Sequence, residues 1–133
     1  MKDKFFKYLH ELQDTITSKL EMIDGSSVFK EDIWKRPEGG GGRTRVIENG
    51  AVFEKGGVNI SSVSGKFEDV MIGKVPGTEN DPSYNATGIS VVLHPNSPHL
   101  PSMHFNTRYL QTEQEWFGGG MDVTPSIKDA NEK

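Results

Sequence analysis

The sequence predicts an α+β chain in which one helix packs against a β-sheet. Residues 3–23 have the spacing of an amphipathic helix, and the segments rich in β-forming residues all follow it, between residues 44 and 125. Helix and strands thus occupy separate stretches of the chain. A length of 133 residues suits one compact domain, so we expect residues 1–133 to form a single unit.

The predicted helix has one apolar stripe. Its apolar side chains recur in steps of three or four: Phe5, Leu9, Leu12, Ile16, Leu20 and Ile23. This spacing places them on one side of a helix, while charged residues are left to face water. Asp3 is a candidate cap at the start, and the segment Asp24–Ser27 provides the stop. We therefore expect the stripe to dock on the sheet.

A β-hairpin is predicted next. Residues 44–47 and 51–54 are short β-rich runs on either side of a turn that contains Asn49-Gly50, a strong hairpin signal. A further strand is expected over residues 58–63, after Gly56-Gly57. Residues 35–43, with four consecutive glycines, predict a break in regular structure before the hairpin.

Irregular structure is expected in two further places. Residues 73–86 are rich in Gly, Pro, Asn and Asp and predict a loop, and residues 126–133 are polar and predict a frayed end. The glycine runs 39–42 and 118–120 lack the context of a phosphate-binding loop. We interpret both runs as places where the backbone bends sharply or where another group approaches closely. Arg43 and Arg45 follow the first run and suit a ligand, a partner or a solvated surface.

Two longer strands, over residues 87–94 and 102–112, carry the most informative pattern. Side chains alternate between the two faces of a strand, so residues two apart share a face. Pro95–Met103 can return the chain antiparallel. In that case one shared face is apolar, and the other presents a hydroxyl, two imidazoles, an amide and a guanidinium: Ser90, His94, His104, Asn106 and Arg108.

These side chains are suited to an anionic ligand with proton transfer available. Arginine offers a planar fork that matches a carboxylate, and histidine exchanges protons near neutral pH. An antiparallel sheet with one solvated face gives the same alternation without any site. The alternation alone therefore leaves both interpretations open.

Composition excludes several functional classes. The net charge of -4 provides no overall field that would attract nucleic acid or an anionic membrane. The absence of cysteine excludes disulfides, thiolate catalysis and cysteine-bound metals. No apolar run approaches the roughly 18 residues of a spanning helix, and the N-terminus has no apolar signal region. We expect a cytoplasmic protein without a membrane span.

Four sequence blocks, in order, resemble one known family. They are GGGGRTRVIENGAVFEKGGVN (39–59), ATGISVVLHP (86–95), PSMHFNTRY (101–109) and WFGGGMDVTP (116–125). Each is similar to a block of the oxygen-dependent coproporphyrinogen III oxidases. This resemblance implies an α+β fold, with a large antiparallel sheet covered by helices, and a homodimer. It favours the site over the merely solvated face.

The family also implies an activity. Its members oxidatively decarboxylate two propionates of coproporphyrinogen III to vinyl groups, which gives protoporphyrinogen IX in haem biosynthesis. Molecular oxygen is the co-substrate, and no cofactor is required. Carried over by position, His104 would be the general acid, and Ser90, Asn106, Thr107 and Arg108 would contact the substrate. His94 and His104 match positions assigned to a divalent metal in some bacterial members.

Thr107 does not fit the shared face. In an ideal strand its side chain points away from that of Arg108, so its contact would be made through the backbone or would need a bulge. The family also continues well beyond residue 133. We therefore expect the chain to be an N-terminal part of the fold and to be inactive alone. The alternatives are a non-catalytic remnant that binds porphyrin or a partner chain, and an unrelated sheet domain that binds a carboxylate ligand.

Overall fold

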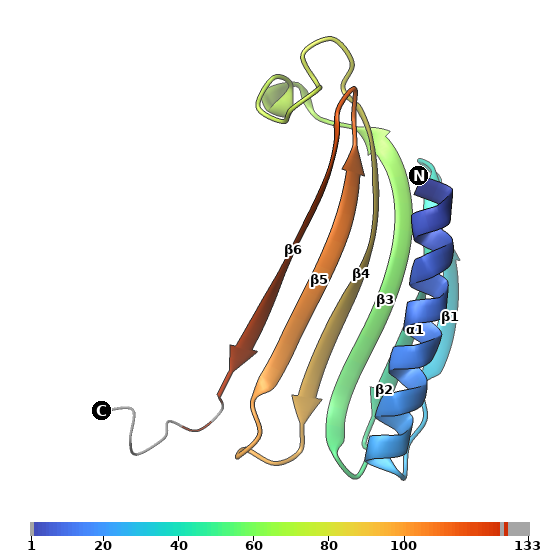
Figure 1. Cartoon of the computed structure of the whole chain (residues 1–133), viewed down its shortest axis with the longest axis vertical. Helices are drawn as coiled ribbons and strands as arrows, with labels where there is room; N and C mark the ends of the chain where they lie inside the picture. The colour runs from blue at the N-terminus through green and yellow to red at the C-terminus, as the bar shows by residue number, and fades with distance from the viewer. Residues whose placement is uncertain (1, 126, 128–133) are drawn as a thin grey trace.

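The computed structural model describes residues 2–125 and 127, and this part of the chain contains one α-helix, one short 3-10 helix and one antiparallel sheet (Figure 1). The six strands lie in the sheet in the order in which they occur in the sequence, so each pairs with the next. This arrangement confirms the predicted α+β class. The elements are α1 (Lys2–Asp24), β1 (Lys30–Lys35), β2 (Gly40–Glu48), β3 (Phe53–Lys66), the short 3-10 helix η1 (Asp69–Met71), β4 (Ser83–Pro95), β5 (Ser102–Gln111) and β6 (Glu115–Thr124).

The Asn-Gly hairpin is confirmed, with longer strands than predicted. Asn49 adopts a φ of 53°, and the turn is closed by Asn49 N–H to Glu54 O and Gly50 N–H to Phe53 O, both at 2.9 Å. The two strands expected over residues 51–54 and 58–63 are wrong as separate elements, because the single strand β3 runs through both glycines between them. Pairing with neighbours on both sides, β2 and β4, overrides the weak strand preference of glycine there.

The first glycine run is only partly a break. The chain turns at residues 36–39, but Gly40–Gly42 already belong to β2. Gly40 has a φ of 86°, and a Cβ on Gly42 would lie 2.5 Å from the Trp34 ring. A sharp bend and a close approach, the two reasons expected for the run, therefore both occur.

Two strands lie outside the predictions. β1 was not predicted, and β6 contains the second glycine run, which we expected to bend. The predicted loop over residues 73–86 begins earlier and ends earlier, because residues 67–82 connect β3 to β4. The frayed end predicted for residues 126–133 lies outside the described residues, apart from Ile127.

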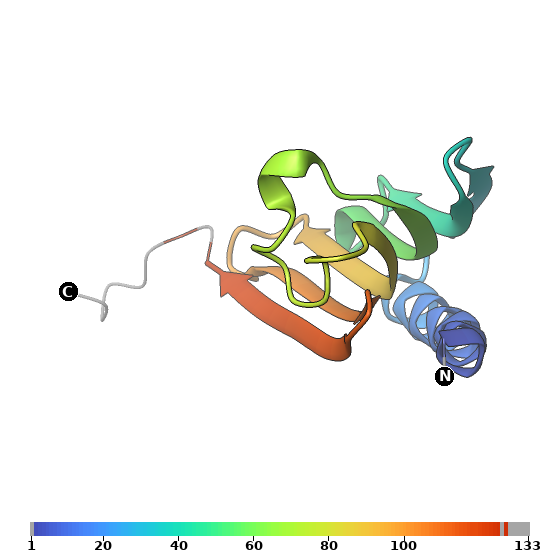
Figure 2. The same cartoon turned by 90° about the horizontal axis from the view of Figure 1, so that it is seen from above.

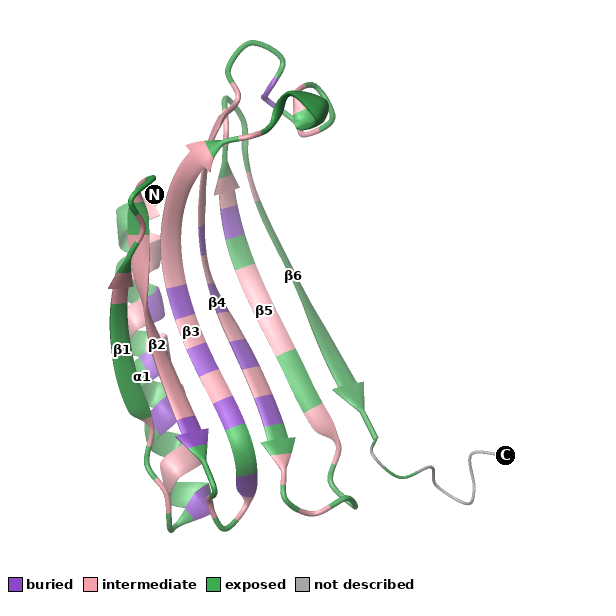
Figure 3. Cartoon of the chain, turned by 180° about the vertical axis from the view of Figure 1, so that it is seen from behind, coloured by how far each residue is buried: buried purple, intermediate pink, exposed green. Residues whose placement is uncertain are grey.

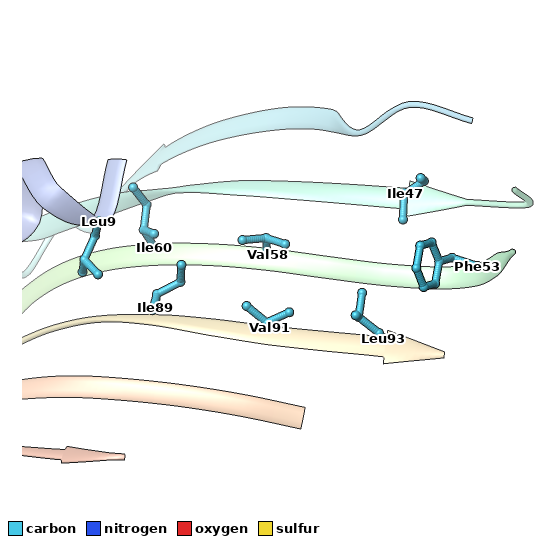
Figure 4. Packing of buried hydrophobic residues seen from close by; sticks show 8 residues of the cluster. All are labelled: Leu9, Ile47, Phe53, Val58, Ile60, Ile89, Val91 and Leu93. Atoms are coloured by element: carbon cyan, nitrogen blue, oxygen red, sulfur yellow. The ribbon is translucent and has the colours of Figure 1, made fainter. Parts of the chain in front are cut away.

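A hydrophobic core lies between α1 and one face of β2, β3 and β4 (Figures 3 and 4). Its buried members are Leu9, Ile47, Phe53, Val58, Ile60, Ile89, Val91 and Leu93. Along β4 the burial alternates from residue to residue, as expected for a strand with one packed face. The other face of the sheet has no α-helix in the described part of the chain, and only the connection that contains η1 passes over it (Figure 2).

The helix face differs from the predicted apolar stripe. Ile23 is 61% exposed, whereas the polar side chains of Gln13 and Thr17 are buried against the sheet. Phe5, Leu12, Ile16 and Leu20 pack at the margin of the core. The most buried line of α1 therefore runs from Leu9 through two polar residues, which apolar spacing cannot detect.

Two arginines of β2 explain the buried polar residues. Arg43 donates from Nε to Gln13 Oε1 (2.6 Å) and from Nη2 to Asp14 Oδ1 (2.9 Å). Arg45 bridges Asp14 Oδ1 at 2.8 Å and Glu31 Oε1 at 2.9 Å. Both arginines are therefore engaged within the fold and are not the solvated surface residues that were one expectation from the sequence. They join α1 and β1 to β2.

Asp24 fastens the end of α1 to the β2–β3 turn. Its carboxylate accepts hydrogen bonds at 3.0 Å from the backbone N–H groups of Ser27, Ala51, Val52 and Phe53. These bonds, led by that from Phe53, hold the pKa of Asp24 well below its usual range, against the opposing effect of burial. The residue thus stabilises the turn mainly in its charged form.

No helix in the described part of the chain is both long enough and apolar enough to cross a membrane.

Replacing Asp24 by asparagine should lower stability in a pH-dependent way. Because its folded-state pKa is depressed, the stabilisation is fully present above the unfolded pKa of about 4 and is lost as the pH falls below it. The urea midpoint of Asp24→Asn should lie below that of the wild type at neutral pH, and the gap should narrow in acid. An equal gap at all pH values would contradict this account. The exposed Asp69→Asn is the control.

Replacing Leu9 by alanine should remove a central part of the core. Leu9 is fully buried, so we expect a loss of about 2–5 kcal/mol in the free energy of unfolding. The neighbouring Tyr8 is 55% exposed, and Tyr8→Ala should change the stability by only about 0.5 kcal/mol. Chemical denaturation of both variants checks the contrast. Equal losses would show that α1 is not docked through Leu9.

Candidate functional site

The pairing of β4 with β5 brings the predicted site residues together. The two strands are antiparallel, and Ser90 lies directly opposite Asn106, Val92 opposite His104 and Gly88 opposite Arg108. The alternation of side chains then places all of these residues on one face of the sheet, the face turned away from α1. We call it the open face. The antiparallel return over Pro95–Met103 is therefore confirmed.

The helix-facing side of the same strands is packed. Thr87, Ile89, Val91 and Leu93 are buried there. Thr107 lies opposite Ile89 on that side, and its hydroxyl contacts Gly118 O at 3.4 Å. The β4–β5 pairing runs through this point without a bulge. Of the two routes predicted for a Thr107 contact with the open face, only the backbone route agrees with this geometry.

The open face contains a hollow of about 640 Å³. It is lined mainly by β3, β4 and β5, with Ser90, His104, Asn106, Thr107 and Arg108 among its residues. The connection 67–82 passes over the same face, on the opposite side of the sheet from α1 (Figure 2). Phe67 and Val75 from this connection also line the hollow. Polar groups at the floor thus lie beneath an apolar overhang.

The overhang is tied to the β5–β6 turn. Thr112 Oγ1 donates to Pro76 O at 2.7 Å, and Glu113 N–H donates to Gly77 O at 3.4 Å. Thr78 is fully buried, with its hydroxyl donating to Val75 O at 2.6 Å. These contacts hold Val75 in place over the hollow.

The charge of Arg108 is available on the open face. Arg43 and Arg45 are both paired with carboxylates of α1 and β1, but no carboxylate within residues 2–125 or at 127 lies within ion-pair distance of Arg108. Arg108 and His104 are both exposed. A guanidinium without a carboxylate partner, beside hydroxyl and amide groups, is suited to binding a carboxylate.

His94 and His104 do not make a metal site with the described residues. Both lie on the open face, and His94 Nδ1 is 3.2 Å from Ser102 Oγ. The described part of the chain contains no cluster of three His, Asp or Glu residues able to hold a metal ion. Two imidazoles fall short of the three or four protein ligands of typical zinc sites. The histidine pair therefore does not form a complete metal site with the residues that the structure describes.

Sequence reasoning missed the contribution of β3 to this hollow. Asn59 lies directly opposite Ser90, and Ser61 lies opposite Gly88, so both share the open face. They line the hollow together with Val63. The signal was present, because the strand predicted over residues 58–63 alternates in the same way as its neighbours. Its polar face could have been aligned with Ser90 only once the β3–β4 register was known.

Comparison with known proteins shows the family of this chain. The family model described as coproporphyrinogen III oxidase matches residues 4–133. The chain belongs to the coproporphyrinogen III oxidase family. An oxygen-dependent coproporphyrinogen-III oxidase of Prochlorococcus marinus (strain NATL2A) is 50% identical over 121 residues, covering 90% of this chain. A chloroplastic oxygen-dependent coproporphyrinogen-III oxidase of Glycine max is 45% identical over 138 residues, covering 92% of the chain.

The match covers only part of the length of these relatives. The aligned region covers 34% of the Prochlorococcus protein and 36% of the Glycine protein. The chain thus spans about a third of the length of the curated coproporphyrinogen-III oxidases that it matches. The open face and its hollow lie within this shared third.

Proposed function

We propose that this chain forms the substrate-binding face for oxygen-dependent decarboxylation of coproporphyrinogen III to protoporphyrinogen IX, a step of haem biosynthesis. The main observation behind this proposal is the exposed Arg108, which has no carboxylate partner among the described residues and lies in a hollow that also contains Ser90, His104 and Asn106. Membership of the coproporphyrinogen III oxidase family supports the choice of ligand. The names of the two relatives support the reaction class.

Each residue has a distinct proposed role. Arg108 binds a propionate carboxylate, and Ser90 and Asn106 add hydrogen bonds from the neighbouring strand positions. Thr107 contributes through its backbone, since its side chain lies on the helix side. His104 acts as general acid, because an imidazole can deliver a proton near neutral pH. The overhanging Val75 and Phe67 suit the apolar parts of a tetrapyrrole.

Molecular oxygen is the proposed oxidant. Each reacting propionate loses its carboxyl group as carbon dioxide and a hydrogen from the adjacent chain, so that a vinyl group remains. The two electrons released per propionate pass to one molecule of oxygen, which takes up the released proton and a second proton and becomes hydrogen peroxide. We propose that the electron-rich reduced tetrapyrrole reacts without a protein-bound cofactor. We call a protein that contains these residues and has the full length of the curated relatives a family-length protein. Metal analysis of such a purified protein would test whether His94 and His104 take part in a metal site that other residues complete.

Assembly and location also remain predictions. We propose a homodimer for the family-length protein, to be tested by native mass measurement. A cytoplasmic location is the expectation from the sequence, although the Glycine max relative is named as chloroplastic. Cell fractionation would distinguish the two compartments.

A non-catalytic porphyrin-binding protein is the second candidate. It is favoured by the exposure of both His104 and Arg108, which leaves the reacting groups open to water. Such a protein would bind the stable oxidised ligand coproporphyrin III without converting coproporphyrinogen III. Binding and turnover assays on the same sample separate the two functions.

Replacing Arg108 by alanine should weaken substrate binding. A hydrogen bond to a charged group contributes about 1.5–3 kcal/mol, so KM in a family-length protein that contains these residues should rise about 10- to 100-fold. Arg36, which pairs with Glu38 outside the hollow, provides the control Arg36→Ala. An unchanged KM in Arg108→Ala would rule out Arg108 as a propionate ligand.

The 133-residue chain alone should release no protoporphyrinogen IX in air. The described residues leave the hollow open above His104 and Arg108, and a solvated site weakens electrostatic contacts with the substrate. The assay is porphyrin fluorescence after oxidation of the products. Product formation above the rate of a sample without protein would show that this third of the family length suffices.

A further inference from the structure

Three polar side chains form a hydrogen-bonded chain across the open face and end at the hollow. Trp34 of β1 donates from Nε1 to Thr44 Oγ1 of β2 at 3.0 Å. Thr44 Oγ1 in turn lies 2.5 Å from Asn59 Oδ1 of β3. Thr44 and Asn59 are directly opposite each other in the β2–β3 pairing. Trp34 itself lies opposite Gly42, two residues away from Thr44 along β2. The chain therefore enters at Thr44 the row that continues through Asn59 to Ser90.

The direction of the protons in this chain is fixed by chemistry. An indole nitrogen can only donate, so Thr44 Oγ1 must accept from Trp34. The single proton of the hydroxyl is then left for Asn59. A separation of 2.5 Å suits O–H···O and is shorter than ordinary N–H···O bonds. The amide oxygen of Asn59 therefore faces Thr44, and its NH₂ group points elsewhere.

The NH₂ group of Asn59 is available to a ligand. Asn59 lines the hollow and lies directly opposite Ser90. Within residues 2–125 and at 127, Nδ2 has no hydrogen-bond acceptor, while no buried side-chain nitrogen or oxygen of that part lacks a partner. Nδ2 is thus unpaired but accessible. An amide held through its oxygen presents two N–H donors to the hollow without having to rotate.

We propose that Asn59 is a further ligand-binding residue of this hollow and that Thr44 and Trp34 are the positioning residues that direct its amide. This inference rests on the proposed function. Asn59, Ser90 and Asn106 occupy directly opposite positions on three neighbouring strands, which spans roughly 10 Å at the usual strand spacing. These three side chains can donate hydrogen bonds to carboxylate or pyrrole-ring substituents of the ligand other than the propionate that Arg108 binds.

Two substitutions at Asn59 distinguish ligand binding from a purely structural role. Asn59→Asp keeps the shape and the acceptor for Thr44 but replaces the donor by a negative charge. Asn59→Ala removes both groups. In a family-length protein that contains these residues, KM for coproporphyrinogen III should rise several-fold in Asn59→Ala and tenfold or more in Asn59→Asp, since repulsion adds to the lost bond. The change in kcat should be smaller than the change in KM.

The positioning role has its own test. Thr44→Val removes the hydroxyl with little change in shape and should raise KM. Thr44→Ser keeps the hydroxyl and should have the KM of the wild type. Ser62 follows Ser61 along β3, so its side chain lies on the opposite, helix-facing side of the sheet. Its hydroxyl forms a hydrogen bond with that of Thr87 there. Ser62→Ala therefore loses one polar group from the same strand and should leave KM unchanged. Equal KM values for Thr44→Val and Thr44→Ser would overturn the positioning role.

The outcomes separate this inference from the proposed function. If Arg108→Ala raises KM but both Asn59 variants stay within twofold of the wild type, the role of Asn59 is wrong and the proposed function stands. If all three leave KM unchanged, the hollow is not the substrate site and both proposals fail. Thermal melts identify any variant that does not fold. If an Asn59 variant does not fold, Asn59→Ser, which retains a small polar group, is tested in its place. A KM equal to that of the wild type in Asn59→Ser then overturns the inference.

Discussion

The pairing register of β4 with β5 is the constraint on which the rest of this structure depends. Side chains alternate with a period of two, so a slip of one residue would move every polar group from the open face into the core. With Ser90 opposite Asn106, apolar residues of β4 face α1 while the polar ones face the hollow. The same register therefore builds the core and the candidate site at once. Packing of Ile89, Val91 and Leu93 against the rest of the core keeps it in place.

Arginines on the two faces of the sheet differ in whether they have carboxylate partners among the described residues. On the helix side, Arg43 and Arg45 meet Asp14 and Glu31, so their charge is neutralised within the fold. On the open face, Arg108 has no such partner among the described residues. An acidic protein can in this way hold an anionic ligand at one point, despite its net charge of -4. Local pairing determines the binding surface more than the overall composition does.

The sequence predicted those parts of the fold that depend on local periodicity. Alternation along β4 and β5 placed Ser90, His104, Asn106 and Arg108 on one face, and the structure agrees. Gln13 and Thr17 could not be predicted as buried, because their burial depends on arginines some 30 residues away. β6 escaped prediction because three glycines carry no strand preference of their own. The role of Asn59 depends on two strand registers, which no single segment contains.

The strict neighbour-to-neighbour order of the strands has a consequence for how the chain assembles. Every strand pairs with the one that follows it in sequence, so each pair can form as soon as its second strand is available, and only the connection 67–82 between β3 and β4 is long. Only α1 must wait, since it precedes β1 but packs on β3 and β4. During synthesis the helix would emerge before the strands and remain without its binding surface until β4 had formed. The open face would be completed later still, with the β4–β5 hairpin, after the core beneath it has found its partners.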